Sequence, residues 1–274
     1  MRELTLPAPL LLLPGLGADG DLFTAQRQGL GDAVSTPAWI APRDPREGLS
    51  DYAARWAERI NPAVAEFGSD RPWFLGGMSM GGMIALEMVP HLERTPAAVL
   101  LISSCRSDAA LPKLIKIAGA LTAKAPARFV AMGVKLGAIP FGVRDGADDD
   151  GTKLLVRMAR STDPDHLKWA IGATGEWTYP GPPESFTRNG EAIDFPPVLQ
   201  VHGRDDWLIP CREDDCDRVV EHGRHLINLS HHHTVNRWLY DHVTRLCGID
   251  ESKEPRIEDP DSTVMRRPEL AARY

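Results

Sequence analysis

One serine of the chain lies in a setting that suits a nucleophile. Ser79 is the middle residue of GMSMG at 77–81, between an apolar, strand-like segment at 73–76 and a helical pattern at 81–92. A G-x-S-x-G stretch between a strand and a helix is typical of a sharp turn that exposes the serine hydroxyl. Glycines are needed two residues before and after the serine, because the turn brings backbone segments too close for a Cβ atom. The pattern predicts that Ser79 attacks an acyl carbon.

A serine nucleophile needs backbone N–H donors for the negative oxygen that forms on its substrate. The N–H of Met80 would stand at the N-terminus of the following helix, where the helix dipole favours a developing oxyanion. A second donor should come from the loop after an earlier strand. The apolar run 10–13 leads into PGLG at 14–17, and the Leu16 N–H is the predicted second donor.

The base that would take the serine proton must be one of nine histidines, five of which lie in residues 221–239. Three of them, residues 231–233, are consecutive and fall in the first turn of a helix that is predicted to start at Ser230 as N-cap and to end at Gly248. That helix is indicated by apolar residues at helical spacing: Val235, Trp238, Leu239, Val243 and Leu246. Neighbours on a helix point about 100° apart, so three in a row do not converge on one metal ion. No metal is predicted.

The residues leave two assignments of the base open. If DRVVE at 217–221 is the last strand, His225 follows it in a loop and is the base. If RHLINL at 224–229 is the last strand, the base is one of His231, His232 and His233.

The elements that must position these groups alternate along the chain. Helical patterns span 49–67 and 81–92. Short apolar runs that are typical of strands lie before, between and after them, at 10–13, 33–35, 73–76, 98–103, 198–202 and near 220 or 227. The alternation predicts an α/β fold with a mostly parallel sheet flanked by helices. We expect one domain, with a core at 1–104 and 197–248, a mostly helical cap insertion at 105–196 and a charged C-terminal tail at 249–274.

The cap insertion is rich in large apolar side chains. They are Leu114, Ile115, Ile117, Leu121, Phe129, Val130, Met132, Leu136, Ile139 and Phe141. We expect most of them to pack between helices within the cap, and some to face a cleft beside Met80 and Leu208.

The loop at 14–17, the serine turn, the segment 198–210 and the histidine segment together resemble the α/β-hydrolase superfamily. The resemblance implies the chain order Ser, Asp, His. GRDDWLIP at 203–210 matches the family pattern Gly-x-x-Asp-x-x-x-Pro and implies Asp206 as the acid. Asp205 then reads as a solvated turn residue, and His202 as a packed or loop-bracing histidine. The family's spacing before the last helix favours His225 over the group 231–233.

This chain departs from the family in the oxyanion loop. Relatives commonly begin that loop with His-Gly, whereas Pro14 precedes Gly15 here. The change removes a side chain that braces the loop and leaves the backbone donor in place.

The resemblance implies a serine hydrolase for a small or medium acyl ester or thioester, which works through an acyl-enzyme without a cofactor. Ser79, Asp206 and His225 would form the triad, and Leu208 would contact the substrate. The alternatives are C–C bond hydrolysis, perhydrolysis or lyase chemistry at the same site, or a non-catalytic binding protein that keeps the fold.

Composition narrows the partners. A formal net charge of −7, without a Lys/Arg run, argues against a nucleic-acid or anionic-membrane surface. No segment reaches the roughly 20 apolar residues that span a bilayer. Four cysteines without CxxC spacing favour a reducing, cytoplasmic setting, and a Cys211–Cys216 pair in an oxidising compartment is the alternative. A small ester-like molecule is the expected partner, and no feature indicates an oligomeric state.

Overall fold

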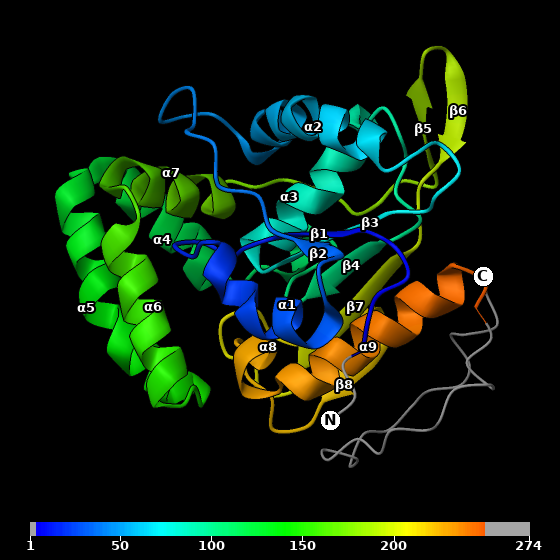
Figure 1. The fold of residues 1–274 in the computed structure, drawn as a ribbon. Coiled ribbons are helices and arrows are strands. Elements are labelled where there is room, and N and C mark those ends of the chain that lie inside the picture. Colours follow the sequence, from blue (N-terminus) through cyan, green and yellow to red (C-terminus); the bar gives the residue numbers. More distant parts are fainter. Residues whose placement is uncertain (1–3, 250–274) are drawn as a thin grey trace.

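The computed structural model describes residues 4–249. Its centre is a six-stranded sheet in which every neighbouring pair is parallel, in the order β2-β1-β3-β4-β7-β8 (Figure 1). The strands are β1 (Leu10–Leu13), β2 (Val34–Ser35), β3 (Phe74–Met78), β4 (Val99–Ile102), β7 (Val198–Gly203) and β8 (Arg218–Val220). The predicted tail lies outside the described residues except for its first residue.

Helices cover both faces of the sheet, because its central strands are apolar at every position. Leu11 and Leu13 point into the core formed with α2 (Leu49–Glu66) and α3 (Met80–Met88). Their neighbours point to the opposite face, as the period of two requires, into the core with α1 (Thr24–Leu30) and α9 (His232–Leu246). Short 3₁₀ turns span Gly20–Phe23, Val89–His91, Asp108–Ala110 and Glu213–Asp215.

The end of the sheet decides between the two assignments of the last strand. The strand is β8, within the predicted segment 217–221. The alternative strand at 224–229 is wrong, because Ile227–Ser230 forms the short helix α8. The predicted N-cap of the final helix also moves by one residue: His231 occupies that position, and the Ser230 hydroxyl lies 3.1 Å from the Leu226 carbonyl oxygen, to which it donates.

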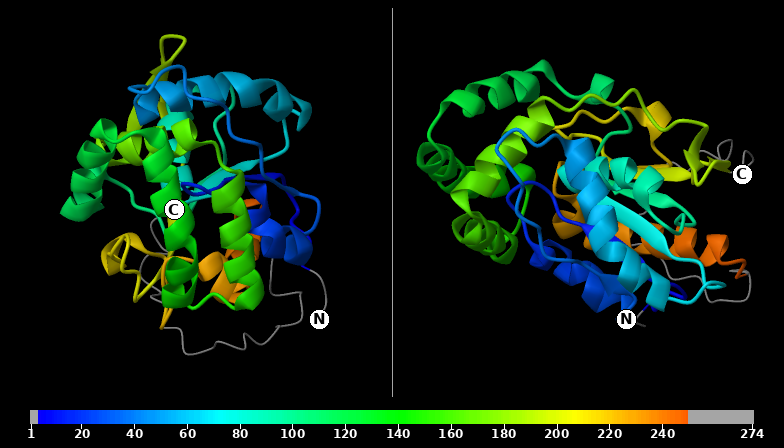
Figure 2. Two further views of the ribbon diagram at one scale, coloured as in Figure 1. Left: turned by 90° about the vertical axis from the view of Figure 1, so that its left-hand side faces the viewer. Right: turned by 90° about the horizontal axis from the view of Figure 1, so that it is seen from above.

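The insertion forms four helices at one end of the sheet, coloured green in Figure 1. They are α4 (Lys113–Lys124), α5 (Ala127–Asp145), α6 (Asp149–Ser161) and α7 (Pro164–Gly175). The left panel of Figure 2 looks onto this end, with α5 and α6 side by side. No helix among residues 4–249 is long and apolar enough to cross a membrane.

A β-hairpin that the sequence analysis did not anticipate follows the cap helices. Strands β5 (Ser185–Arg188) and β6 (Glu191–Asp194) pair antiparallel. Asn189 and Gly190 join them with φ angles of 52° and 84°. Positive φ at both central residues is the geometry of the tight turn that Asn-Gly favours, so this dipeptide was an available signal.

The predicted packing of the cap's apolar residues is wrong for seven of the ten. Small residues make the close helix contacts instead. On α5 the buried positions include Ala131, Ala138 and Gly142, and Gly119 of α4 lies directly against Gly175 of α7. The larger side chains are left exposed on the outside, namely Leu114, Ile117, Leu121, Phe129, Met132, Leu136 and Ile139.

Candidate active site

Ser79 forms the single-residue turn between β3 and α3. Its backbone has φ 53° and ψ −125°, a left-handed conformation that costs a non-glycine residue on the order of 1–3 kcal/mol. Neighbouring backbone holds it there: Ser79 N donates to the Ile102 carbonyl of β4 at 3.1 Å, and the Ser79 carbonyl accepts from the Ser104 hydroxyl at 2.7 Å. The fold thereby maintains a strained serine at the end of a central strand.

The two glycines of the motif are required by close approach. A Cβ on Gly77 would collide with the backbone of Gly81 on the next turn, and a Cβ on Gly81 would collide with the carbonyls of Leu13 and Pro14. The second contact also packs the helix start against the predicted oxyanion loop.

His225 and Asp206 meet at the same end of the sheet. His225 Nδ1 lies 2.8 Å from Asp206 Oδ2, and the side chains are 4% and 0% exposed. The other carboxylate oxygen, Oδ1, accepts from the backbone N–H groups of Leu208 and Ile209, each at 2.9 Å. These bonds fix the carboxylate in a single orientation. Asp205 instead has an exposed side chain.

His202 is a second histidine that contacts the Asp206 carboxylate. Its Nε2 lies 3.0 Å from Asp206 Oδ2 and 2.8 Å from the Ile209 carbonyl oxygen, while Gln200 Nε2 lies 3.2 Å from its Nδ1. Burial tends to lower the pKa of His202, but the hydrogen bond with Asp206 raises the pKa above its ordinary value. His202 is thus both buried and bonded to the segment 206–209, in line with the prediction of a packed or loop-bracing histidine.

The surroundings keep Asp206 ionised. Burial would raise its pKa, but the charge of His225 and the hydrogen bonds from His225 and His202 outweigh burial and hold the pKa of Asp206 well below its ordinary value. A carboxylate that stays charged at neutral pH can orient a histidine and stabilise its protonated form.

Ser79 and His225 line one apolar cavity of about 390 Å³ under the cap. The predicted oxyanion residues Leu16 and Met80 line the same cavity, as does Leu208. Within residues 4–249 the Ser79 hydroxyl makes no hydrogen bond to His225 in this resting structure. Such bonds often tighten only when substrate is bound.

The three consecutive histidines lie elsewhere, at the junction of α8 and α9. Nδ1 of His231 lies 2.9 Å from the Ser230 hydroxyl, and Nδ1 of His232 lies 3.1 Å from the Leu229 carbonyl oxygen. Among the described residues that line the cavity, none belongs to this group. The structure therefore brings His225, and not 231–233, to Asp206 and the cavity.

A buried carboxylate of the cap holds the loop that carries His225. Asp145, at the end of α5, is 2% exposed, and its two oxygens accept from the backbone N–H groups of His225, at 2.9 Å, and Leu226. Burial raises the pKa of Asp145 above its ordinary value, although these two bonds oppose the rise. The ring of Phe141, one turn earlier, meets the His225 ring edge-on with centroids 6.4 Å apart. Nothing in the local sequence pointed to Asp145.

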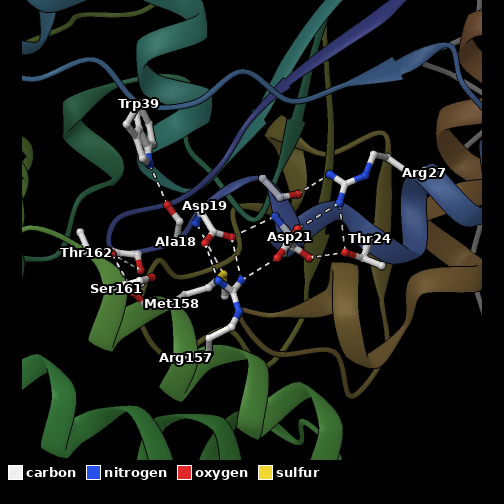
Figure 3. Close-up of polar contacts among 12 residues, drawn as sticks. Ala18, Asp19, Asp21, Thr24, Arg27, Trp39, Arg157, Met158, Ser161 and Thr162 are labelled. Atoms are coloured by element: carbon white, nitrogen blue, oxygen red, sulfur yellow. Dashed lines mark hydrogen bonds and ion pairs between the residues drawn. The ribbon is translucent and has the colours of Figure 1, made fainter.

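The cap also contacts the predicted oxyanion loop and the residues that follow it (Figure 3). The guanidinium of Arg157 on α6 donates to the Asp19 carboxylate at 2.9 and 3.0 Å and to Asp21 at 2.8 Å. The Thr162 hydroxyl lies 3.2 Å from the Gly17 carbonyl oxygen. Burial would raise the pKa of Asp19, but the bonds to Arg157 help to lower it. These contacts tie residues 17–21 to the cap.

No group of three or more His, Cys, Asp and Glu side chains within residues 4–249 is arranged to hold a metal ion.

No family model and no curated protein matches the chain. Solved structures do. A thermophilic esterase from Thermogutta terrifontis (18% identity) aligns over 89% of this chain and 92% of its own, with a TM-score of 0.62. MenH from S. aureus (12% identity) aligns over 90% of this chain and 97% of its own, with a TM-score of 0.61. Bromoperoxidase from Bacillus anthracis (17% identity) aligns over 86% of this chain and 91% of its own, with a TM-score of 0.59. This chain has the α/β-hydrolase fold. At these identities the likeness establishes the fold, and its chemistry must be argued from the residues.

The candidate residues lie at the carboxyl ends of three parallel strands. Ser79 follows β3, Asp206 follows β7, and His225 follows β8. Parallel strands bring these ends to one edge of the sheet, which is where ligands bind in open α/β sheets.

Proposed function

We propose that the protein is a serine hydrolase that cleaves a small or medium acyl ester or thioester through an acyl-enzyme. Ser79 is the nucleophile, His225 the base, Asp206 the orienting acid, and the N–H groups of Leu16 and Met80 stabilise the oxyanion.

The hydrogen bonds assign a role to each ring nitrogen of His225. Because Nδ1 is bonded to Asp206, Nε2 is the nitrogen that accepts the Ser79 proton as Oγ attacks the acyl carbon. The tetrahedral intermediate collapses with loss of the alcohol or thiol, which takes that proton from His225. A water molecule then attacks the acyl carbon while the same nitrogen takes its proton; Ser79 Oγ leaves, takes that proton back from His225, and the carboxylic acid is released.

The observation that carries the proposal is the strained backbone of Ser79 in the same cavity as a histidine that is bonded to a buried carboxylate. A strained non-glycine residue persists only where its surroundings over-determine it, and such residues cluster at active sites. Here the strained residue is a serine, and it lines the same cavity as His225.

The cavity supports an acyl substrate. Its walls include Met83, Val134, Phe141, Leu155 and Leu208, all apolar. Burying a CH₂ group against such walls is worth about 0.8 kcal/mol. A small ester with a hydrocarbon acyl chain fits this lining better than a charged peptide does.

We also propose a cytoplasmic location. The chain has only four cysteines, and their spacing matches no CxxC pattern, which favours a reducing compartment.

Labelling with a fluorophosphonate tests the proposed function. The probe should attach to Ser79 alone, as located by mass spectrometry of peptides, and Ser79→Ala should abolish labelling. Ser103 and Ser104 are internal controls, because both are buried next to the turn and Ser103 also has a positive φ of 43°. Labelling of either, or no labelling of the folded protein, would contradict the mechanism.

A further inference from the structure

Cap helices α4 and α5 each carry a row of exposed large apolar side chains. On α5 they recur at helical spacing, with Leu136 71% exposed and Val143 65% exposed. Soluble proteins rarely leave such an area open unless it binds something. We call this surface the cap face; it consists of Leu114, Ile117, Leu121, Phe129, Met132, Leu136, Ile139 and Val143.

The cap face is also locally basic. Residues 109–144 contain six Lys and Arg and no Asp or Glu, in a chain whose net charge is −7; of these six, Lys116 is paired with Asp108 at 3.1 Å. Exposed cations stand at both ends of α4 and at the start of α5: Lys113, Lys124 and Arg128. The net charge of the whole chain is negative and argued against an anionic surface as partner, but the charge of this segment is positive.

The same helices form the outer wall of the candidate active site. Ile115 of α4 and Val134 and Phe141 of α5 line the cavity from the inside. Helix α5 is therefore apolar on its cavity side and on its solvent side.

We infer that the cap face docks on the surface of anionic lipid aggregates. Its apolar side chains would enter the boundary between headgroups and acyl chains, and its lysines and arginines would face anionic headgroups, which is the composition of helices that lie in a membrane interface. The docking itself rests on the cap face alone. Delivery of an acyl substrate to Ser79 from that surface rests on the proposed function.

Charge favours lipid over a second copy of this chain. A two-fold symmetric dimer through the cap face would bring the same patch from each copy together. The exposed cations Lys113, Lys124 and Arg128 would then approach their own counterparts without acidic partners on the segment to offset them.

Vesicle flotation tests the inference with the full-length protein. Binding is compared between vesicles of phosphatidylcholine and an equimolar mixture of phosphatidylcholine and phosphatidylglycerol. We expect binding to the mixed vesicles, weakened by high salt. The double change Lys124→Glu and Arg128→Glu should reduce the partition coefficient by about fivefold or more for each cation lost.

The apolar half of the face has its own variant. Leu136→Ser with Ile139→Ser should reduce binding to mixed vesicles by about tenfold or more, since two large apolar side chains no longer enter the interface. Arg59→Glu on α2 and Ile249→Ser after α9 are matched controls, because both residues are exposed and lie outside the cap. Neither control should change binding.

Two readouts separate this inference from the proposed function. Ser79→Ala should bind vesicles as the unchanged protein does, and the cap-face variants should keep kcat/KM for a soluble, short-chain p-nitrophenyl ester. Failure to bind mixed vesicles, or equal loss in the Arg59→Glu control, would overturn the inference. So would concentration-dependent dimerisation by light scattering that the cap-face variants abolish, which would assign the face to a second copy.

Discussion

Asp206 and His225 come from different loops and meet through one hydrogen bond, with Asp206 Oδ2 2.8 Å from His225 Nδ1. The acid's remaining oxygen is occupied by two backbone N–H groups, and Oδ2 is shared with His202 at 3.0 Å. The carboxylate therefore has no freedom to reorient, and the imidazole it holds presents only Nε2 for proton transfer.

Asp206→Asn should lower kcat by about 10⁴-fold, because an amide can donate to Nδ1 and so stabilise the wrong tautomer of His225. The measurement is steady-state hydrolysis of a p-nitrophenyl ester. The neighbouring change Asp205→Asn is the control, since that side chain is 53% exposed, and it should leave most activity. Equal losses in the two variants would contradict the assignment of the acid.

His225→Ala should be as damaging as Ser79→Ala, with kcat reduced by at least about 10⁴-fold, because members of a triad act as a unit. Single changes of His231, His232 and His233 to alanine should each leave most activity. If one of these three proved essential while His225→Ala stayed active, the base would have been misassigned.

The stability contributed by Asp206 should depend on pH. Its pKa is depressed in the folded protein, so its carboxylate stabilises the fold above the ordinary Asp pKa, and this contribution is lost as pH falls toward the folded-state value. Asp206→Asn should therefore lower the urea midpoint at pH 7, and the difference from the unchanged protein should narrow below about pH 5. A difference that stays constant down to about pH 2 would mean that the charge of Asp206 does not stabilise the fold.

Local signals predicted the core of this fold and Ser79, because a strand, a sharp turn and a helix leave their marks within a few adjacent residues. The acid and the histidine needed the family resemblance, since their meeting depends on two separate strand ends. The contact of Asp145 with the His225 loop could not be predicted from the sequence. Asp145 lies 80 residues before His225, and only the packing of α5 against the core brings them together. The exposure of the cap's apolar residues was missed for a related reason, because the periodicity of α5 does not say which of its two apolar faces is buried.

Asp145 should act as a positioning residue. Asp145→Ala removes the acceptor for the His225 and Leu226 N–H groups, and a displaced base should lower kcat by up to about 100-fold with little change in KM. Asp148→Ala is the matched control, because Asp148 caps α6 through Gly151 N and lies on the same cap. It should lower the thermal midpoint without the loss in kcat. If both variants lost kcat and stability to the same extent, Asp145 would have a structural role only.

The acyl-chain preference should follow the cavity. Each methylene buried against its apolar walls is worth about 0.8 kcal/mol, so kcat/KM should rise up to about fourfold per added carbon until the cavity is full. We expect p-nitrophenyl esters of about C4 to C8 to react faster than acetate, with charged peptides and long triglycerides as poor substrates.

Two tryptophan substitutions on α5 test whether the cavity sets this preference. Val134 lines the cavity, so Val134→Trp should fill part of it and move the preferred chain length toward acetate. Leu136 lies on the outer side of the same helix, 71% exposed, and Leu136→Trp should leave the profile of soluble esters unchanged. The two variants add a large side chain to one helix, so a shift caused by disturbed packing of α5 would affect both. If kcat/KM of the unchanged protein falls steadily as the acyl chain is lengthened from acetate, the acyl chain does not bind in the cavity. The apolar lining would then serve only to pack the cap on the core.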